Sequence, residues 1–222
     1  NIPGQAGKYS NFACSCGSIL SLPEDLSIKP EYTCSACGSK HSGEIYDKAL
    51  LHLQHFELAG AALSLALVYS IEKDKTYSDK AEEILSKYAI FFAELNNSGP
   101  YNSILEGSIC ELKLIIALAQ AYDLIYYSRS LSEKMRSAIE EKLLLPAGNA
   151  LIEMDGGPAR QAWQISAAGI AGLAAKDARL AAAAIGRYRH IIAEYLGSDG
   201  LWPATPETCR SYPLTAVVQF AE

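Results

Sequence analysis

Four of the six cysteines stand in two closely spaced pairs near the start of the chain. Cys14 and Cys16 form a Cys-x-Cys pair, Cys34 and Cys37 form a Cys-x-x-Cys pair, and 17 residues separate the two. Each pair is followed directly by glycine, so four thiolates on two tight turns can supply the tetrahedral ligand set of a structural zinc ion. We therefore predict a closed zinc site with no open position for chemistry. Two disulfides in an oxidising compartment are the alternative.

Two polar residues open a later predicted helix. Arg160 and Gln161 follow Gly156-Gly157-Pro158, and the free backbone N–H groups at a helix N-terminus attract anions. The same residues could equally form a solvated first turn. Because the net charge of the chain is −6, any anionic ligand has to be held by such local groups.

The remaining polar residues suggest structural roles. His52 and His55 lie three residues apart on a mostly apolar segment without further metal ligands nearby, so we interpret them as structural histidines. Glu111 and Asp123 fall at opposite ends of one predicted helix, which does not give the facing carboxylate pair of a glycosidase.

Composition limits the class of protein. The 222 residues, half of them apolar, suffice for one sizeable core or two modest ones. The negative charge and the lack of a basic stripe exclude a nucleic-acid partner, and no apolar run is long enough to predict a membrane span. No signal-peptide pattern is present, and because the chain begins with Asn1 we expect a processed product or a piece of a longer protein.

Helical periodicity begins after a short, turn-rich segment. Residues 1–43 show strand-like pieces only around 18–22 and 31–34, and Tyr46 opens the first helical pattern. The predicted helices cover 46–70, 79–95 with Ser78 as N-cap, 109–127, 133–154 with Ser132 as N-cap, 160–175 and 178–196. Pro146 is expected to kink or split the fourth.

Short links between these helices predict antiparallel pairs stacked on one another. The third and fifth helices are apolar on more than one face, and Ala167, Ala168, Gly169 and Gly172 would let a neighbouring helix approach closely. No repeat of solenoid length is present. We predict an all-α fold, an incomplete (α/α) toroid over 44–222, preceded by a four-cysteine zinc-knuckle segment over 1–43.

Three segments, taken in order, resemble the heparinase II/III-like polysaccharide lyases. They are the knuckles with the helical hairpin over 46–89, the hairpin over 108–144, and residues 160–186 followed by Asp199-Gly200-Leu201-Trp202. The resemblance implies an (α/α) toroid that continues into further helices and a C-terminal β-sandwich domain, so we expect this chain to be truncated. It also implies lyase activity on a polysaccharide or oligosaccharide that contains uronic acid, and favours a periplasmic or secreted location.

The family's reaction is β-elimination next to a carboxylate. Because the C5 proton of a uronic acid is weakly acidic, one group must hold the sugar carboxylate while another removes that proton. The resemblance implies Tyr212 as the catalytic tyrosine and Arg160 or Gln161 as the carboxylate-holding group. Trp163, Trp202 and Arg210 would contact the substrate, although burial is the commoner fate of a tryptophan. No organic cofactor is implied.

The chain departs from the family pattern at two positions. Ala159 stands where members have the neutralising asparagine, and an ungapped alignment from Asp199 puts Cys209 at the catalytic tyrosine and Arg210 at a common histidine. A gap of three residues would instead bring Tyr212 to that position. The alternatives are therefore a non-catalytic helical domain with a structural zinc, binding carbohydrate or a partner, or a glycoside hydrolase on the same scaffold.

Overall fold

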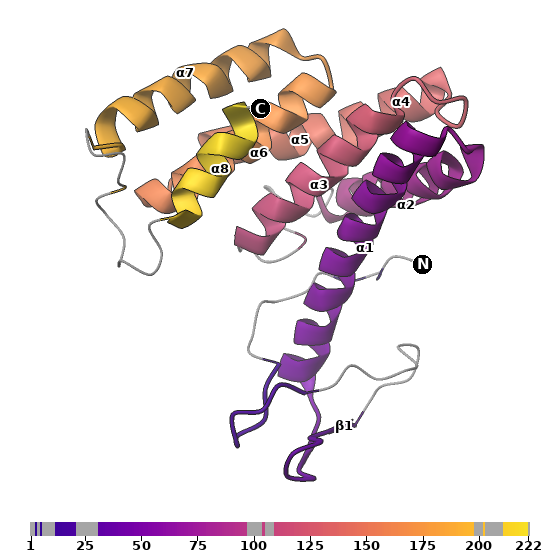
Figure 1. Ribbon diagram of the computed structural model, residues 1–222, viewed down its shortest axis with the longest axis vertical. Helices are drawn as coiled ribbons and strands as arrows, with labels where there is room; N and C mark the ends of the chain where they lie inside the picture. Colours follow the sequence, from indigo (N-terminus) through magenta and orange to yellow (C-terminus); the bar gives the residue numbers. More distant parts are fainter. Residues whose placement is uncertain are drawn as a thin grey trace.

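The computed structural model describes residues 3, 5, 12–20, 31–96, 104, 109–197, 202 and 211–221, without the side chains of 96, 211 and 212. Within these ranges the protein is mostly helical, and the four paired cysteines cluster near the start of the chain. The all-α prediction is confirmed. Figure 1 shows α1 (Glu44–Glu72) running from the cysteine-bearing turns at one end of the molecule into the body formed by the other helices.

The cysteine-bearing segment has very little regular structure. β1 (Tyr32–Thr33) pairs antiparallel with β2 (Lys40–His41), and an isolated bridge joins Ala13 to Ile19. A small core of Phe12, Leu20 and Tyr32 packs on Leu50 of α1. Tyr32 also donates a hydrogen bond to Asp47 Oδ1 at 3.2 Å. The turns are thereby attached to the first turns of α1.

The helices follow the predicted order closely. After α1 come α2 (Lys75–Asn96), α3 (Ile109–Ile125), α4 (Glu133–Ile139), the π-helical η1 (Glu140–Leu144), α5 (Leu145–Glu153), α6 (Pro158–Ala174), α7 (Ala178–Tyr195) and α8 (Ser211–Ala221). Ser132 caps α4 as predicted, because its side chain accepts a hydrogen bond from the Met135 N–H. Pro146 does split the fourth helix: the π-helical turn of η1 immediately precedes α5, and the proline occupies the first turn of α5.

The predicted cap at Ser78 is wrong. α2 begins three residues earlier, at Lys75, where Asp74 Oδ1 accepts a hydrogen bond from the Thr76 N–H. Ser78 lies inside the helix, and its Oγ donates back to the Lys75 carbonyl and lies 2.7 Å from Ser130 Oγ. Asp74 and Ser78 are both residues that commonly cap helices, and they stand four residues apart. The helix begins after the first of them, so Ser78 falls inside it.

The helices pack in two rows. α1, α3, α6 and α8 contact one another in that order. α2 packs on α1 and α3, α5 and α7 pack on α6, and α4 contacts α2 and η1. α3 and α6 each touch helices on several sides, as their apolar surfaces predicted. At Gly172 an added Cβ would lie 3.0 Å from the Ala181 backbone nitrogen, so α6 and α7 approach too closely there for a side chain. This confirms the predicted role of the small residues on α6.

Two hydrogen bonds hold the last helix in place. Ser166 Oγ of α6 donates to the Ala216 carbonyl of α8, and Tyr188 of α7 donates to the Val217 carbonyl at 3.2 Å. Residues 217–221 at the end of the described chain belong to α8. The inner row therefore ends, in the described chain, with α8.

Candidate functional site

The four paired cysteines converge on one point. Their Sγ atoms all lie within 4.8 Å of one another, with Cys14 to Cys37 at 3.5 Å and Cys16 to Cys34 at 3.7 Å. A tetrahedral ion with metal–sulfur bonds near 2.3 Å separates its ligands by about 3.8 Å, whereas a disulfide requires about 2.05 Å. All four are free thiols. The geometry is able to bind a metal ion and contains no disulfide among these cysteines.

Two matching turns position the thiols. In each turn a glycine with positive φ, Gly17 at 88° and Gly38 at 71°, donates its N–H to the carbonyl of the first cysteine, Cys14 or Cys34. The left-handed backbone that follows each cysteine pair is one that glycine adopts without strain. This is why both pairs are followed by glycine, and it explains how Cys-x-Cys and Cys-x-x-Cys can present similar pairs of sulfurs.

The electrostatics of the turns also favour a cation. Hydrogen bonds with Ser18 lower the pKa of the Cys16 thiol to about 6, and those with Ser39 lower the pKa of Cys37. For Cys14, the backbone N–H of Cys16 favours the thiolate, but desolvation and the neighbouring thiols together raise its pKa to about 11. Four thiolates cannot share this space without a positive ion to offset their repulsion.

His41 is a member of the cluster that the sequence analysis missed. Its Nε2 lies 3.2 Å from Cys14 Sγ and its Nδ1 lies 3.0 Å from the hydroxyl of Tyr46, in the first turn of α1. A ring N–H directed at a metal-bound thiolate is a typical outer partner of such a site. The signal was present in the sequence, because His41 follows Cys37 by only four residues.

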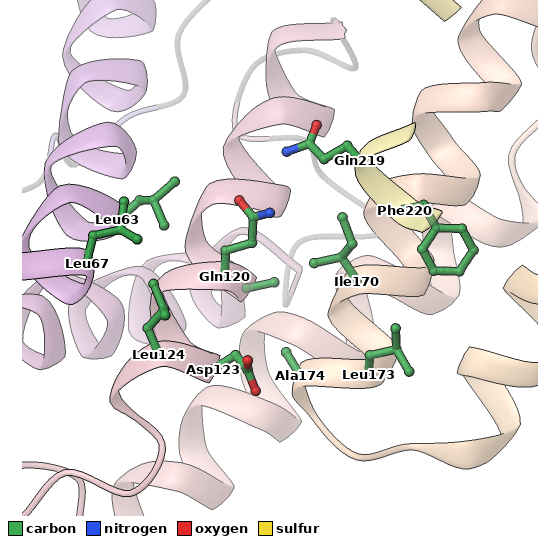
Figure 2. Close-up of a pocket in the computed structure, with 11 residues that line it drawn as sticks. Leu63, Leu67, Gln120, Asp123, Leu124, Ile170, Leu173, Ala174, Gln219 and Phe220 are labelled. Carbon is green, nitrogen blue, oxygen red and sulfur yellow. The ribbon is translucent and has the colours of Figure 1, made fainter. Parts of the chain in front are cut away.

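A groove runs along the inner row of helices. A cavity of about 520 Å³ lies between α1, α3, α6 and α8, and a second of about 240 Å³ adjoins it. Both are lined by Leu63, Gln120 and Gln219, so we treat them together as the inner groove. Figure 2 shows the first cavity, with Leu63 and Leu67 on one side, Ile170, Leu173 and Phe220 on the other, and Gln120, Asp123 and Gln219 as its polar residues.

One end of the inner groove carries a positive charge. The second cavity is lined by Lys113 and Trp163, and Lys113 Nζ lies 4.9 Å from the centroid of the Trp163 indole. Trp163 is otherwise almost fully buried, at 2% exposure. This end of the groove lies at the first turns of α6, where the Lys113 ammonium sits over the aromatic face of Trp163. Lys113 was not singled out from the sequence.

The predicted site residues on α6 do not all face this groove. Gln161 lines a separate pocket between α6 and α7, while Trp163 faces α3, because successive helical residues are about 100° apart. Arg160 is half-buried, and its Cδ would lie 3.0 Å from a Cβ added to Gly156. The structure therefore brings Trp163 to the groove and takes Gln161 to the opposite side of the helix.

The site residues from the end of the chain are only partly described. Trp202 is fully buried and its ring stacks on Tyr195 with centroids 5.9 Å apart. Tyr212 lies in the first turn of α8, and its side chain falls outside the described residues, as do Cys209 and Arg210. Their relation to Arg160 remains a prediction.

The remaining candidates have structural surroundings. Both histidines of α1 are buried: His55 Nε2 donates to the Gln5 carbonyl at 2.9 Å, and its Nδ1 lies 3.1 Å from the Tyr88 hydroxyl. Glu111 is buried and accepts from the Ile104 N–H at 2.9 Å, while Asp123 is exposed near the other end of α3. These contacts agree with structural histidines and with the absence of a facing carboxylate pair on α3.

Hydropathy adds one finding about α1. By length and composition it could cross a membrane, and 28% of its most apolar stretch is buried inside the protein. A core helix of a soluble protein meets the same criterion, so this property alone does not place α1 in a lipid bilayer.

Comparison of the chain with protein-family models, with curated proteins and with solved structures found no match.

Proposed function

We propose that this chain is part of the helical domain of a polysaccharide lyase that cleaves uronic-acid-containing polysaccharide by β-elimination. The observation that carries the proposal is the inner groove, which runs along α1, α3, α6 and α8 and ends at Lys113 and Trp163 beside the first turns of α6. The resemblance in sequence implies a lyase active site at that same end of α6. A two-row array with a groove along its inner row is also what part of an (α/α) toroid would present.

In this proposal the roles of the residues follow their positions. Because Gln161 lines the pocket on the far side of α6, we assign the sugar carboxylate to Arg160. Arg160 lines neither cavity of the inner groove, whereas Lys113 does and supplies the cation at the groove end. Their charges stabilise the dianion that forms when the C5 proton leaves. Tyr212 takes that proton and returns one to the departing oxygen.

A second candidate function has its own support. By the resemblance, Ala159 stands where the family has its neutralising asparagine, and in the ungapped alignment Cys209 stands at the catalytic tyrosine. Trp163 and Trp202 are buried rather than presented as exposed stacking platforms. A non-catalytic domain that binds an acidic saccharide in the inner groove would keep the cations and lose turnover. It differs from the lyase in one measurable respect, because it creates no unsaturated product.

The metal at the cysteine cluster is proposed to be zinc. Four thiolates at tetrahedral spacing match its preferred structural site, and a closed coordination sphere leaves the ion without a catalytic role. The ion would fasten the two turns to each other and, through His41 and Tyr46, to the start of α1. Its function would be to hold the N-terminal segment on the helical body.

Ultraviolet absorbance tests the lyase proposal, because elimination creates a conjugated double bond in the product. The full chain is incubated in turn with heparan sulfate, hyaluronan, chondroitin sulfate, alginate and ulvan, and binding is measured in parallel by affinity electrophoresis. The lyase proposal expects a rise in absorbance with one polymer, lost in Arg160→Leu and retained in Arg189→Leu, a change at an exposed arginine of α7. Binding without a rise in absorbance supports the non-catalytic alternative. The absence of both binding and a rise in absorbance rejects both proposals.

A further inference from the structure

A second, polar pocket lies between α5, α6 and α7. It encloses about 230 Å³ and is reached from the outer side of α6, where Leu151, Gln161, Gln164, Arg187, Glu194 and Tyr195 contribute to its wall. It shares no lining residue with the inner groove. The pocket is therefore separate from the inner groove. Gln161 was expected from the sequence to belong to the lyase site, but its position on α6 directs its side chain into this pocket.

One residue in this wall is unusual. Gln164 is 2% exposed, yet within the described part of the chain neither its Oε1 nor its Nε2 has a hydrogen-bond partner. A buried amide without partners costs about 1–3 kcal/mol for each unsatisfied group, and buried polar groups in folded proteins are nearly always paired. Two orphaned atoms on one side chain that lines a cavity indicate that something else supplies their hydrogen bonds.

We propose that this pocket binds a small neutral polyhydroxylated molecule the size of a monosaccharide. The Gln164 amide carries an acceptor and a donor side by side, and two neighbouring hydroxyl groups match that pair because each hydroxyl can both donate and accept. Both amide atoms are buried behind the cavity wall, with Oε1 3.0 Å from a Cβ added to Gly156, so the side chain has to turn toward the cavity for the ligand to reach them. Gln161 adds a second amide at the same wall. A ring of hydroxyl-bearing carbons satisfies several such groups at once.

The charges of the pocket favour a neutral ligand. Glu194 would repel a carboxylate or phosphate, and Arg187 would repel an amine, while both can hydrogen-bond a hydroxyl. His190 Nε2 lies 2.9 Å from Glu194 Oε2 on the exposed surface of α7 at the edge of the pocket. Leu151 with two isoleucines of α6 and α7, Ile165 and Ile191, supplies an apolar surface for the C–H face of a sugar ring.

The inference does not depend on the lyase proposal. The lyase ligand is an anionic polymer in the inner groove, whereas this ligand is a neutral monomer held on the opposite side of α6. Failure of one leaves the other in place, because different residues, ligands and measurements are involved.

The test is a titration with D-glucose, D-galactose, D-mannose and glycerol, each followed by NMR of the side-chain amides and by calorimetry. We expect at least one of them to shift the Gln164 amide resonance, which is assigned from its loss in Gln164→Leu. That variant should weaken binding at least tenfold while unfolding at the same or a higher temperature, since it removes two unpaired buried polar atoms. The matched control is Gln120→Leu in the inner groove, which should bind as the unchanged chain does.

A variant on the pocket rim guards against a folding defect. Arg187 is exposed, so Arg187→Ala should leave the fold intact and weaken binding about threefold through loss of a hydrogen-bond donor. The proposal is overturned if none of the four compounds shifts the Gln164 resonance at tens of millimolar, a concentration at which even weak polar ligands bind. It is equally overturned if Gln164→Leu and Arg187→Ala both bind like the unchanged chain.

Discussion

Replacing Gly172 by alanine tests how α6, which carries the proposed site, is held against α7. A Cβ built on Gly172 would lie 3.0 Å from the backbone nitrogen of Ala181 and 3.0 Å from Leu180 Cγ. Both neighbours are at the start of α7, and Leu180 and Ala181 are themselves buried. A backbone nitrogen inside a helix cannot rotate away, so the two helices have to move apart by a few tenths of an ångström or distort.

Two opposing effects set the size of the change. Overpacking of this kind costs about 1–3 kcal/mol, whereas alanine is favoured over glycine inside a helix by about 1 kcal/mol. The net expectation for Gly172→Ala is a loss of about 0–2 kcal/mol in the free energy of unfolding. Gly186 is the matched control, because it lies inside α7 with nothing within 4 Å of an added Cβ. Gly186→Ala should gain about 1 kcal/mol.

Urea unfolding followed by circular dichroism measures the difference directly. The two glycine-to-alanine changes have the same chemistry and the same helix propensity, so their difference of about 1–3 kcal/mol isolates the close contact between α6 and α7. Equal stabilisation by both variants would mean that the two helices do not touch at Gly172, and the packing described for α6 would then be wrong.

Three further predictions concern the metal cluster, the buried histidines and one buried hydrogen bond. Elemental analysis should find about one zinc per chain, and Cys34→Ser should lose it together with the protection of the first turns of α1 from amide exchange. Burial lowers the pKa of His52 and His55, so the unfolded chain binds more protons below its own histidine pKa of about 6.5. The free energy of unfolding should therefore be fully retained above that pH and fall as the pH drops toward the lowered pKa values of the folded chain. The fall with pH should be shallower in His55→Gln. An identical pH dependence in that variant would exclude His55 as a cause. Tyr122 donates a hydrogen bond to Glu140, and Tyr122→Phe should cost about 1.5–3 kcal/mol in urea unfolding, as expected for a bond to a charged group; an unchanged midpoint would show that water replaces it.

The sequence predicted the helices well because each carries a buried face with helical periodicity. In α1, α2 and α7, apolar residues that recur at helical spacing in the sequence are buried in the structure. Ser132 was identified correctly as a cap, although Ser130 and Ser128 stand two and four residues before it. Ser78 was not, since Asp74 starts the helix earlier. Residue type alone therefore does not decide which of several nearby capping residues begins a helix.

The candidate site was less accessible to sequence reasoning. Arg160, Gln161 and Trp163 are neighbours in sequence, yet helical geometry sends Gln161 and Trp163 into different pockets. The direction of each depends on where α3 and α7 lie, which no local pattern encodes. Gln164 was missed because a glutamine in an apolar helix gives no sign that its amide is buried without partners. The cysteine cluster, by contrast, was predictable because ligand type and spacing are both local.

The most direct test of the proposed function is the appearance of an unsaturated uronate when the full chain acts on acidic polysaccharide. The proposal predicts a product with the ultraviolet absorbance of the conjugated double bond, lighter by one water than a hydrolysis product, and formed much more slowly when Arg160 is replaced by leucine. A chain that binds the polymer but leaves it intact, or releases saturated ends, would contradict the lyase proposal.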